Sequence, residues 1–434
     1  MEDTSDTELI KRCINISCVE KKDANNNIFS FGWTTSLSSF KDSLIYNYFR
    51  FNSKFDLPPT KVQLYNKIFN TSKQEEIQKF NNKFSKIIYV SYRSRFKPQI
   101  NVKNNKEYTS DCGWGCMIRS SQMILCRAIY KIFKYKYKSE KNLIYHVIPF
   151  VMDKNLDLVK YKYLGFDSYI NKLKEFGKKD IVQIDPPFSI HKIVILGESF
   201  GRASGEWFSD FELPKIYNTI NTTFSIIPDL SIIHYNSFIE LNTILEKCFK
   251  VDVSENKENN IINDKENNNN VFNFEGKNYL MEKMGLIFVS VRLGLDNITP
   301  EYFPSIFKLF SCKECLGFIG GKKWTNSASY FFGYYENFLL YLDPHFNNQS
   351  IDHLDNDNIY TYTNKIIYKI DIKTLKAGFT IGFLFRNMKE FNELLIFFKE
   401  QQKLENPCFA YSDGKVKDEI IKDQINEISE KDDF

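Results

Sequence analysis

The clearest periodic pattern in the chain runs from Cys116 to Ala128. Small and apolar residues recur there at three- and four-residue steps, at Met117, Ser121, Ile124, Leu125 and Ala128. This spacing places them on one face of a helix. The segment is therefore predicted to be a helix that begins at or next to Cys116 and packs into the core.

Other segments carry the patterns of strands and shorter helices. Runs rich in β-branched and aromatic residues predict strands, and they span Ile87–Tyr92, Leu286–Arg292, Leu316–Ile319 and Tyr330–Leu342. The last two are expected to pair in a sheet that packs against the Cys116 helix. Helices are indicated by a charged segment at 71–83, a cap at Ser189, a first-turn proline after Thr299 and an amphipathic pattern at 388–402.

The length of the chain and its polar segments indicate which part of it is ordered. Its 434 residues exceed the roughly 250–300 at which one hydrophobic core stops growing, so one large domain with an appendage is expected. Residues 1–27 are polar and predict a flexible lead-in, and the charged tail at 421–434 is predicted to be loose. The Asn-rich segment 252–270 has too little apolar surface to offset its ordering entropy, which predicts disorder.

The charge balance narrows the classes of partner. Lysine and arginine number 58 and aspartate and glutamate 54, for a net charge of +4, which argues against nucleic acid as the main partner. Residues 131–141 are locally basic. A solvated helix face is the simpler interpretation of that cluster, and contact with an anionic membrane is the alternative.

Nine cysteines without dense spacing do not predict a disulfide framework. Cys312 and Cys315 form a C-x-x-C pair, but no second pair lies at a zinc spacing, so neither metal nor redox chemistry is expected there. Cys112 and Cys126 lie near Cys116 and only weakly suggest redox modulation. The acidic N-terminus lacks the apolar core of a signal peptide, and no apolar run approaches the ~20 residues of a membrane helix. A cytoplasmic location is therefore expected.

Cys116 is the strongest candidate for chemistry. Gly113 and Gly115 bracket Trp114 directly before it, and the two glycines allow the backbone to turn sharply. A cysteine at a helix start meets unpaired N–H groups and the positive end of the helix dipole, which favour a thiolate. Most free cysteines are small buried core residues, but the Gly-Trp-Gly turn before a helix favours a nucleophile.

A nucleophilic cysteine needs a base, and His345 is the best placed of the five histidines. It follows Asp343 and Pro344 at the end of an aromatic and aliphatic run, and residues two apart on a strand share a face. Asp343 would then orient the imidazole as the third member of a catalytic triad. An Asp-Pro surface turn explains the same residues equally well.

Eight short motifs are spread along most of the chain. They are Thr109–Arg119, Ser189–Ile193, Gly205–Phe208, Val291–Leu295, Leu316–Lys322, Tyr330–Tyr334, Tyr341–His345 and Ala377–Phe383. In this order and spacing they resemble the autophagins, cysteine endopeptidases that process ubiquitin-like modifiers in autophagy. The resemblance implies an α+β fold with a papain-like cysteine protease core. The expected peptidase domain spans 28–420, with a small auxiliary subdomain at about 181–250.

The resemblance also implies a role for each candidate catalytic residue. Cys116 is the nucleophile, His345 the general base and acid, and Asp343 the residue that orients the histidine. Tyr92 falls on a tyrosine whose hydroxyl helps to form the oxyanion hole. The implied reaction is cleavage just after the C-terminal glycine of a GABARAP-type ubiquitin-like modifier. It matures the precursor and also releases the modifier from phosphatidylethanolamine.

The substrate groove follows from the same resemblance. Trp207 falls on the tryptophan that lids the groove, and Gly320 and Gly321 open the loop beside that lid. Gly197–Gly205 looks superficially like a phosphate-binding loop but lacks the Gly-Lys-Ser/Thr ending, so a mobile glycine-rich flap carrying Trp207 is expected. Lys322–Thr325 is longer than the usual turn of the family. The sequence therefore does not decide whether this loop closes over the groove.

The implied partners are a GABARAP-type modifier and its phosphatidylethanolamine conjugate, with peripheral membrane contact through the substrate. No cofactor, metal or nucleic acid is expected, and the chain is expected to act as a cytoplasmic monomer. Two alternatives stay open: a deubiquitinase-like thiol hydrolase on the same fold, and a catalytically inactive binder of a ubiquitin-like partner. Cleavage of ubiquitin fusions would indicate the first, and binding without alkylation of Cys116 at neutral pH would indicate the second.

Overall fold

The computed structural model describes residues 54–138, 143–153, 186–252, 271–323, 327–351, 354–355 and 357–414. The predictions for the lead-in at 1–27, for all but the first residue of the Asn-rich segment 252–270 and for the tail at 421–434 lie outside these residues. So do Trp324 and Thr325 of the loop that differs from the family turn.

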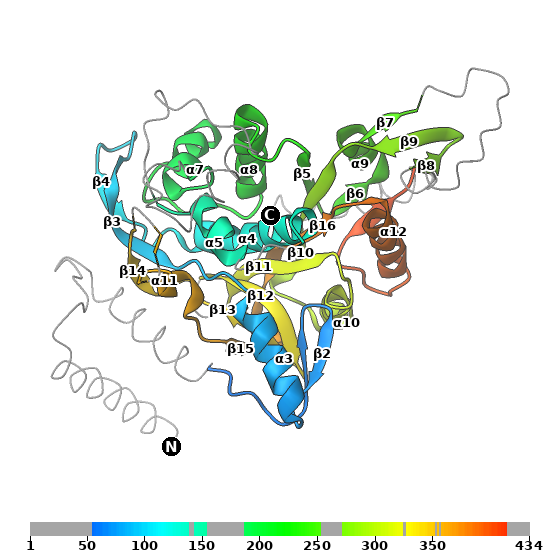
Figure 1. Ribbon diagram of the computed structural model, residues 1–434, viewed down its shortest axis with the longest axis horizontal. Helices are drawn as coiled ribbons and strands as arrows, with labels where there is room; N and C mark the ends of the chain where they lie inside the picture. Colours follow the sequence, from blue (N-terminus) through cyan, green and yellow to red (C-terminus); the bar gives the residue numbers. More distant parts are fainter. Residues whose placement is uncertain are drawn as a thin grey trace.

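A mixed sheet of nine described strands forms the centre of the molecule (Figure 1). Neighbouring strands are antiparallel except β10 and β5, which pair in parallel. The strand order is β15 (Tyr368–Asp371), β13 (Phe338–Leu342), β12 (Ala328–Tyr335), β11 (Cys315–Lys322), β16 (Leu375–Phe385), β10 (Met284–Asn297) and β5 (Leu230–Asn236). In addition, β1 (Lys61–Leu64) pairs with β12 and with β2 (Lys67–Asn70).

The central strands are almost continuously apolar because both faces of the sheet are covered. In β16 every residue from Phe379 to Phe385 is buried. In β10, Leu286 and Phe288 enter one hydrophobic core, whereas the neighbouring Ile287 and Val289 enter a second. This alternation is what the pleat of a strand imposes, and it separates the molecule into two cores with the sheet between them.

Helices cover both faces of the sheet. α4 (Cys116–Lys136), α7 (Ile190–Gly197) and α8 (Glu212–Phe224) contribute to the first core, together with α3 (Gln74–Ser85), α5 (Leu143–Val147) and α11 (Tyr360–Thr363). α9 (Leu241–Cys248), α10 (Phe303–Leu309) and α12 (Met388–Gln402) contribute to the second. Figure 1 shows α4 lying across the sheet with α7 and α8 grouped beside it. None of the described helices combines the length and apolar character needed to cross a membrane.

A glycine in the sheet allows α4 to approach closely. At Gly382 in β16, a Cβ atom would lie 2.7 Å from the Cδ1 atom of Ile124 on α4. A side chain at this position would require Ile124 to move. The glycine therefore permits close packing of α4 against β16.

Three smaller sheets surround the central one. They are β14 (Asn347–Gln349) with β3 (Tyr92–Ile100) and β4 (Glu107–Ser110), β17 (Ala410–Ser412) with β6 (Phe238–Glu240), and β7 (Phe249–Val251) with β9 (Lys277–Met281) and β8 (Val271–Phe274). The first of these matters for the candidate site. Tyr92, at the start of β3, pairs with Asn347 on β14, and this register holds Tyr92 beside the segment that contains His345.

Several sequence predictions are confirmed. The mixture of helices and mainly antiparallel strands is the predicted α+β class, and α4, α7 and α12 form where the patterns predicted them. Ser189 caps α7, since its hydroxyl oxygen accepts a hydrogen bond from the backbone N–H of Lys192. The predicted pairing of β11 with β12 is also present.

Two predicted strands differ from the structure. Of Ile87–Tyr92 only Tyr92 lies in a strand, because the preceding backbone does not bond to a neighbouring strand; the N–H of Tyr89, for example, bonds to the carbonyl of Tyr362 in α11. Tyr330–Leu342 contains two strands, since the chain turns at Glu336, whose φ is +50°. β5 belongs to the main sheet although it lies inside the range expected for the auxiliary subdomain, and the division into domains stays a prediction.

Candidate active site

Cys116 is the first residue of α4 and is 8% exposed. The turn before it is closed by hydrogen bonds from the backbone N–H groups of Trp114 (3.2 Å) and Gly115 (2.9 Å) to the carbonyl oxygen of Asp111. Gly113 adopts the left-handed φ of +88° in this turn, which favours glycine. No side chain caps the helix, so the N–H groups of its first turn and its dipole act on Cys116 directly.

His345 and Asp343 lie just beyond the end of β13. The Oδ1 atom of Asp343 accepts hydrogen bonds from the Nδ1–H of the His345 ring and, at 3.1 Å, from the His345 backbone N–H. The carboxylate is almost completely buried and the imidazole is 12% exposed. Two bonds to one oxygen fix both the tautomer and the orientation of the ring, so its other nitrogen is directed elsewhere.

The second ring nitrogen of His345 bonds to the Cys116 sulfur. The His345 imidazole and the Cys116 thiol are hydrogen-bonded, and they shift one another's protonation. Burial by itself raises the pKa of Cys116, but the hydrogen bond and charge of His345, with the Ala328 backbone N–H and the Tyr92 hydroxyl, lower the pKa overall. Burial lowers the pKa of His345, but Asp343 and Cys116 raise it overall. Both directions favour a thiolate paired with an imidazolium.

Tyr92 completes this group of side chains. Its ring stands at 80° to the His345 ring with 5.0 Å between the centroids, and its backbone N–H donates to the carbonyl of Pro344 at 2.8 Å. Its hydroxyl is hydrogen-bonded to the Cys116 thiol. Burial, followed by the charge of Cys116, holds the pKa of Tyr92 well above its ordinary value. The hydroxyl therefore stays protonated and can donate to negative charge next to the sulfur.

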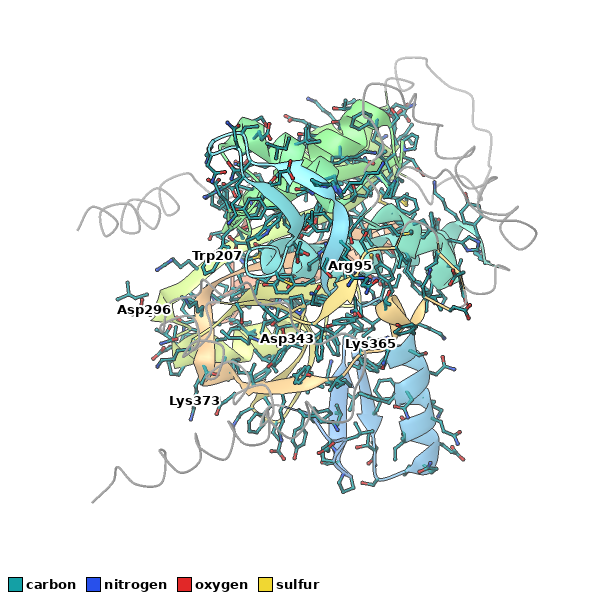
Figure 2. All side chains as sticks on the ribbon, turned by 90° about the vertical axis from the view of Figure 1, so that its left-hand side faces the viewer. Arg95, Trp207, Asp296, Asp343, Lys365 and Lys373 are labelled. Atoms are coloured by element: carbon teal, nitrogen blue, oxygen red, sulfur yellow. The ribbon has the colours of Figure 1, made fainter. Side chains whose placement is uncertain are left out.

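Trp207 lies over the turn that precedes Cys116. Its indole Nε1–H donates a 2.7 Å hydrogen bond to the carbonyl oxygen of Gly113, and the residue is 55% exposed. The loop that carries it is anchored by the ion pair of Glu206 with Lys103 at 2.7 Å and by the hydrogen bond from Asn101 to the carbonyl of Ser204 at 2.5 Å. Figure 2 labels both residues, with Trp207 above the buried Asp343 in this view.

Gly320 and Gly321 are strand residues rather than loop residues. They lie near the end of β11, directly before Lys322, the last residue of that strand. A Cβ atom on Gly320 would lie 2.9 Å from the Cβ of Phe379 in β16, so close strand packing accounts for this glycine. The prediction that the two glycines open a loop is corrected in this respect, because the loop begins only after Lys322.

Lys322 touches the candidate triad, although the sequence placed it in a surface loop. Its Nζ atom lies 3.4 Å from the Oδ2 of Asp343, and the two side chains are 7% and 1% exposed. The ammonium also lies 4.6 Å from the centroid of the Tyr341 ring. A charged residue that directly follows an apolar strand and Gly-Gly was the available signal, but its partner could be identified only from the fold.

A buried ionic network supports the Cys116 turn from behind and was also missed. The guanidinium of Arg119, on α4, donates to Asp111 at 2.8 Å and to Asp153 at 2.7 Å, and all three side chains are fully buried. Asp111 also accepts from the backbone N–H of Arg93 at 2.6 Å. The network thus joins the residue after Tyr92 to the turn before Cys116. Its signal in the sequence was an arginine in the first turn of a helix whose neighbouring residues are apolar or small.

The C-x-x-C pair at Cys312 and Cys315 lies within the described part of the chain. Within the described part of the chain, no three or more of the His, Cys, Asp and Glu side chains gather where they could hold a metal ion. Cys312 and Cys315 are buried free thiols. Burial raises the pKa of Cys312 well above its ordinary value and that of Cys315 to about 12. Both are therefore protonated and poor nucleophiles at neutral pH.

The arrangement around Cys116 is suited to acyl transfer. It places at a helix start a cysteine whose pKa is lowered, beside it a histidine whose pKa is raised and whose ring a buried carboxylate orients, and a protonated hydroxyl next to the sulfur. These groups can respectively attack a carbonyl carbon, protonate a leaving group and donate to a developing oxyanion.

The chain is similar to known proteins across most of its length. Residues 77–396 match the Peptidase C54 catalytic domain. The cysteine protease ATG4D of Xenopus laevis is 25% identical over 373 residues, which cover 79% of this chain and 73% of that protein. The probable cysteine protease atg4 of Aspergillus niger is 24% identical over 338 residues, covering 72% and 70%. The cysteine protease ATG4a of Arabidopsis thaliana is 26% identical over 320 residues, covering 72% and 60%.

Proposed function

Because the chain belongs to the peptidase C54 family of papain-like, autophagy-related cysteine proteases, we propose that it cleaves after the C-terminal glycine of a GABARAP-type ubiquitin-like modifier. In this proposal it both matures the precursor and releases the modifier from its phosphatidylethanolamine conjugate. The observation that carries the proposal is the hydrogen-bonded chain from Cys116 through His345 to Asp343 at the first turn of α4.

The first chemical step forms an acyl-enzyme. The Cys116 thiolate attacks the carbonyl carbon of the substrate glycine, which gives a tetrahedral oxyanion. The Cys116 backbone N–H and the Tyr92 hydroxyl donate hydrogen bonds to that oxyanion. Protonation of the leaving nitrogen by the His345 imidazolium breaks its bond to the carbonyl carbon and leaves a thioester between Cys116 and the glycine.

The second step restores the enzyme. His345, now neutral, removes a proton from a water molecule, and the resulting hydroxide attacks the thioester carbonyl. Collapse of this second tetrahedral species releases the glycine carboxylate and returns Cys116 as a thiolate beside the imidazolium. The leaving amine is that of a peptide in the precursor and that of phosphatidylethanolamine in the conjugate, so one mechanism serves both reactions.

Selectivity for glycine is supported by the position of Trp207. Its indole is bonded to the carbonyl of Gly113 three residues before the nucleophile, and it narrows the approach to Cys116. We propose that Trp207 acts as the lid of the groove and that the end of β11, at Gly320 and Gly321, borders it. A substrate residue with a side chain would collide with this lid, whereas glycine fits beneath it.

The location and partners belong to the same proposal. We propose a cytoplasmic monomer that takes the modifier and its phosphatidylethanolamine conjugate as substrates and reaches the membrane through the conjugate. This requires no transmembrane segment in the enzyme. The partner is a ubiquitin-like protein whose flexible, glycine-ended tail can enter the groove.

The direct test is incubation with a purified GABARAP-type modifier that carries extra residues after its glycine. The expected product ends at the glycine, and Cys116→Ser should give no product. Cleavage of a linear ubiquitin fusion instead would favour the deubiquitinase-like alternative. Binding of the modifier without cleavage, together with no alkylation of Cys116 at neutral pH, would favour the inactive binder and contradict the proposal.

A further inference from the structure

The buried Lys322 contacts the carboxylate oxygen of Asp343 that does not bond to His345. His345 bonds to Oδ1 of Asp343, and the Lys322 ammonium lies 3.4 Å from Oδ2. The two carboxylate oxygens therefore have separate cationic or donor partners on opposite sides. Lys322 reaches this position from the last residue of β11, whereas Asp343 follows the end of β13.

The charges of the four side chains sum to zero when all are ionised. Cys116, His345, Asp343 and Lys322 are all at most 12% exposed. Without the lysine, a thiolate, an imidazolium and a carboxylate would leave one net negative charge out of contact with water. Burying an uncompensated charge is costly, so the ammonium makes the reactive form of the site the charge-balanced one.

We propose that Lys322 is a positioning residue of the catalytic site, which keeps Asp343 ionised and oriented and thereby maintains the thiolate of Cys116 beside the imidazolium of His345. Lys322 does not touch the reacting atoms and acts through the carboxylate. The inference depends only on thiol protease chemistry at Cys116 and not on the identity of the modifier.

The sign of the effect follows from the order of the groups. A nearby positive charge favours a thiolate and opposes an imidazolium, but the Asp343 carboxylate lies between Lys322 and the His345 ring. Burial lowers the pKa of Lys322, but the charges of Asp343, Tyr341 and Cys116 raise it overall, so the ammonium stays charged. Among the described residues, Tyr341 acts on Lys322 and Tyr92 bonds to Cys116, and the charges of Asp111 and Cys112 act on Tyr92.

A purely structural role for Lys322 is the competing explanation. The lysine precedes the segment that leads to Ala328, whose backbone N–H donates to the Cys116 sulfur. If Lys322 only anchored this segment, its loss would weaken reactivity equally at every pH. If it acts through charge, its loss raises the pKa of Cys116 and weakens reactivity mainly on the acid side.

The experiment measures carbamidomethylation of Cys116 by iodoacetamide as a function of pH in the full chain, with Cys116→Ser as the background. Lys322→Met removes the charge, and Lys322→Arg keeps it. In Lys322→Met we expect the acid limb of the alkylation profile to move to higher pH by about one unit. At a given pH on that limb the reaction is then roughly tenfold slower than in wild type. The plateau rate at higher pH should be similar. Lys322→Arg should keep the wild-type limb.

A second neutral variant and a double variant serve as controls. If Lys322→Met does not fold, as judged by its thermal unfolding, Lys322→Gln takes its place as a second neutral variant. In an Asp343→Asn background, Lys322→Met should add a much smaller shift, because only the weaker direct attraction between Lys322 and the Cys116 thiolate remains. An unchanged acid limb in the neutral variants, or an equal shift in Lys322→Arg, would overturn the proposal.

Discussion

The indole Nε1–H of Trp207 donates a 2.7 Å hydrogen bond to the carbonyl oxygen of Gly113. This bond joins the loop between α7 and α8 to the turn that ends at the nucleophile, so the exposed tryptophan is held in one place relative to Cys116. A large aromatic side chain that is more than half exposed is unfavourable unless it covers something, which supports the proposal that Trp207 acts as a lid.

Truncation of this lid should widen the groove. Trp207→Ala loses both the hydrogen bond and the ring, so Cys116 should react several-fold faster with a bulky maleimide, while cleavage of the modifier precursor falls because its glycine tail is held less well. Phe200→Ala removes an exposed aromatic residue of the same loop region and serves as the matched control. Equal maleimide rates in Trp207→Ala and wild type would contradict the lid role.

Removal of the Tyr92 hydroxyl should slow cleavage without removing it. Tyr92→Phe keeps the ring against His345 but loses one donor to the oxyanion, and loss of such a donor costs ~10²–10³-fold in rate. The precursor cleavage assay measures this directly. Tyr130→Phe, further along α4, is the control and should leave the rate unchanged. A loss of less than about threefold in Tyr92→Phe would exclude the oxyanion role.

The plot of the cleavage rate against pH should be bell-shaped. Below the pKa of Cys116, which His345 and its neighbours lower, the thiolate is protonated and the rate falls. Above the pKa of His345, which Asp343 and Cys116 raise, the imidazolium is lost and the rate falls again. In His345→Ala, alkylation of Cys116 should instead rise only near the ordinary ionisation of a thiol. A wild-type alkylation profile that already follows an ordinary thiol would contradict the ion pair.

The ionic network behind the site should be essential for stability. Arg119→Met leaves Asp111 and Asp153 buried without their shared cation, and breaking a buried pair in this way costs about 3–5 kcal/mol of unfolding free energy. Chemical denaturation of the two proteins measures the difference. Lys79→Met breaks the exposed ion pair with Glu76 and should leave the unfolding free energy almost unchanged, because solvent screens exposed ion pairs. A similar small cost for Arg119→Met would show that the network is not needed.

The parts of the site that could be predicted are those whose residues lie close together in the sequence. A Gly-Trp-Gly turn before an amphipathic helix marked Cys116, and residues two apart marked Asp343 with His345. The structure brings these three side chains together with Tyr92. Their roles in catalysis are tested by the experiments above.

Partners that are distant in sequence could not be predicted. Lys322 meets Asp343 across 21 residues and Arg119 meets Asp153 across 34, and only the sheet and the packing of α4 bring them together. The family resemblance placed Gly320 and Gly321 at the opening of a loop, and the glycines themselves do not decide the matter, because glycine occurs both in turns and in strands that pack closely. Local pattern alone cannot distinguish these two uses.

The most direct test of the central claim uses a GABARAP-type modifier whose C-terminal glycine is replaced by a propargylamide, a group that captures an attacking thiolate. Intact mass and peptide mapping then identify the residue that has reacted. The account predicts one adduct, on Cys116, that is absent in Cys116→Ser and strongly reduced in His345→Ala. No adduct, or an adduct on another cysteine such as the exposed Cys112, would contradict it.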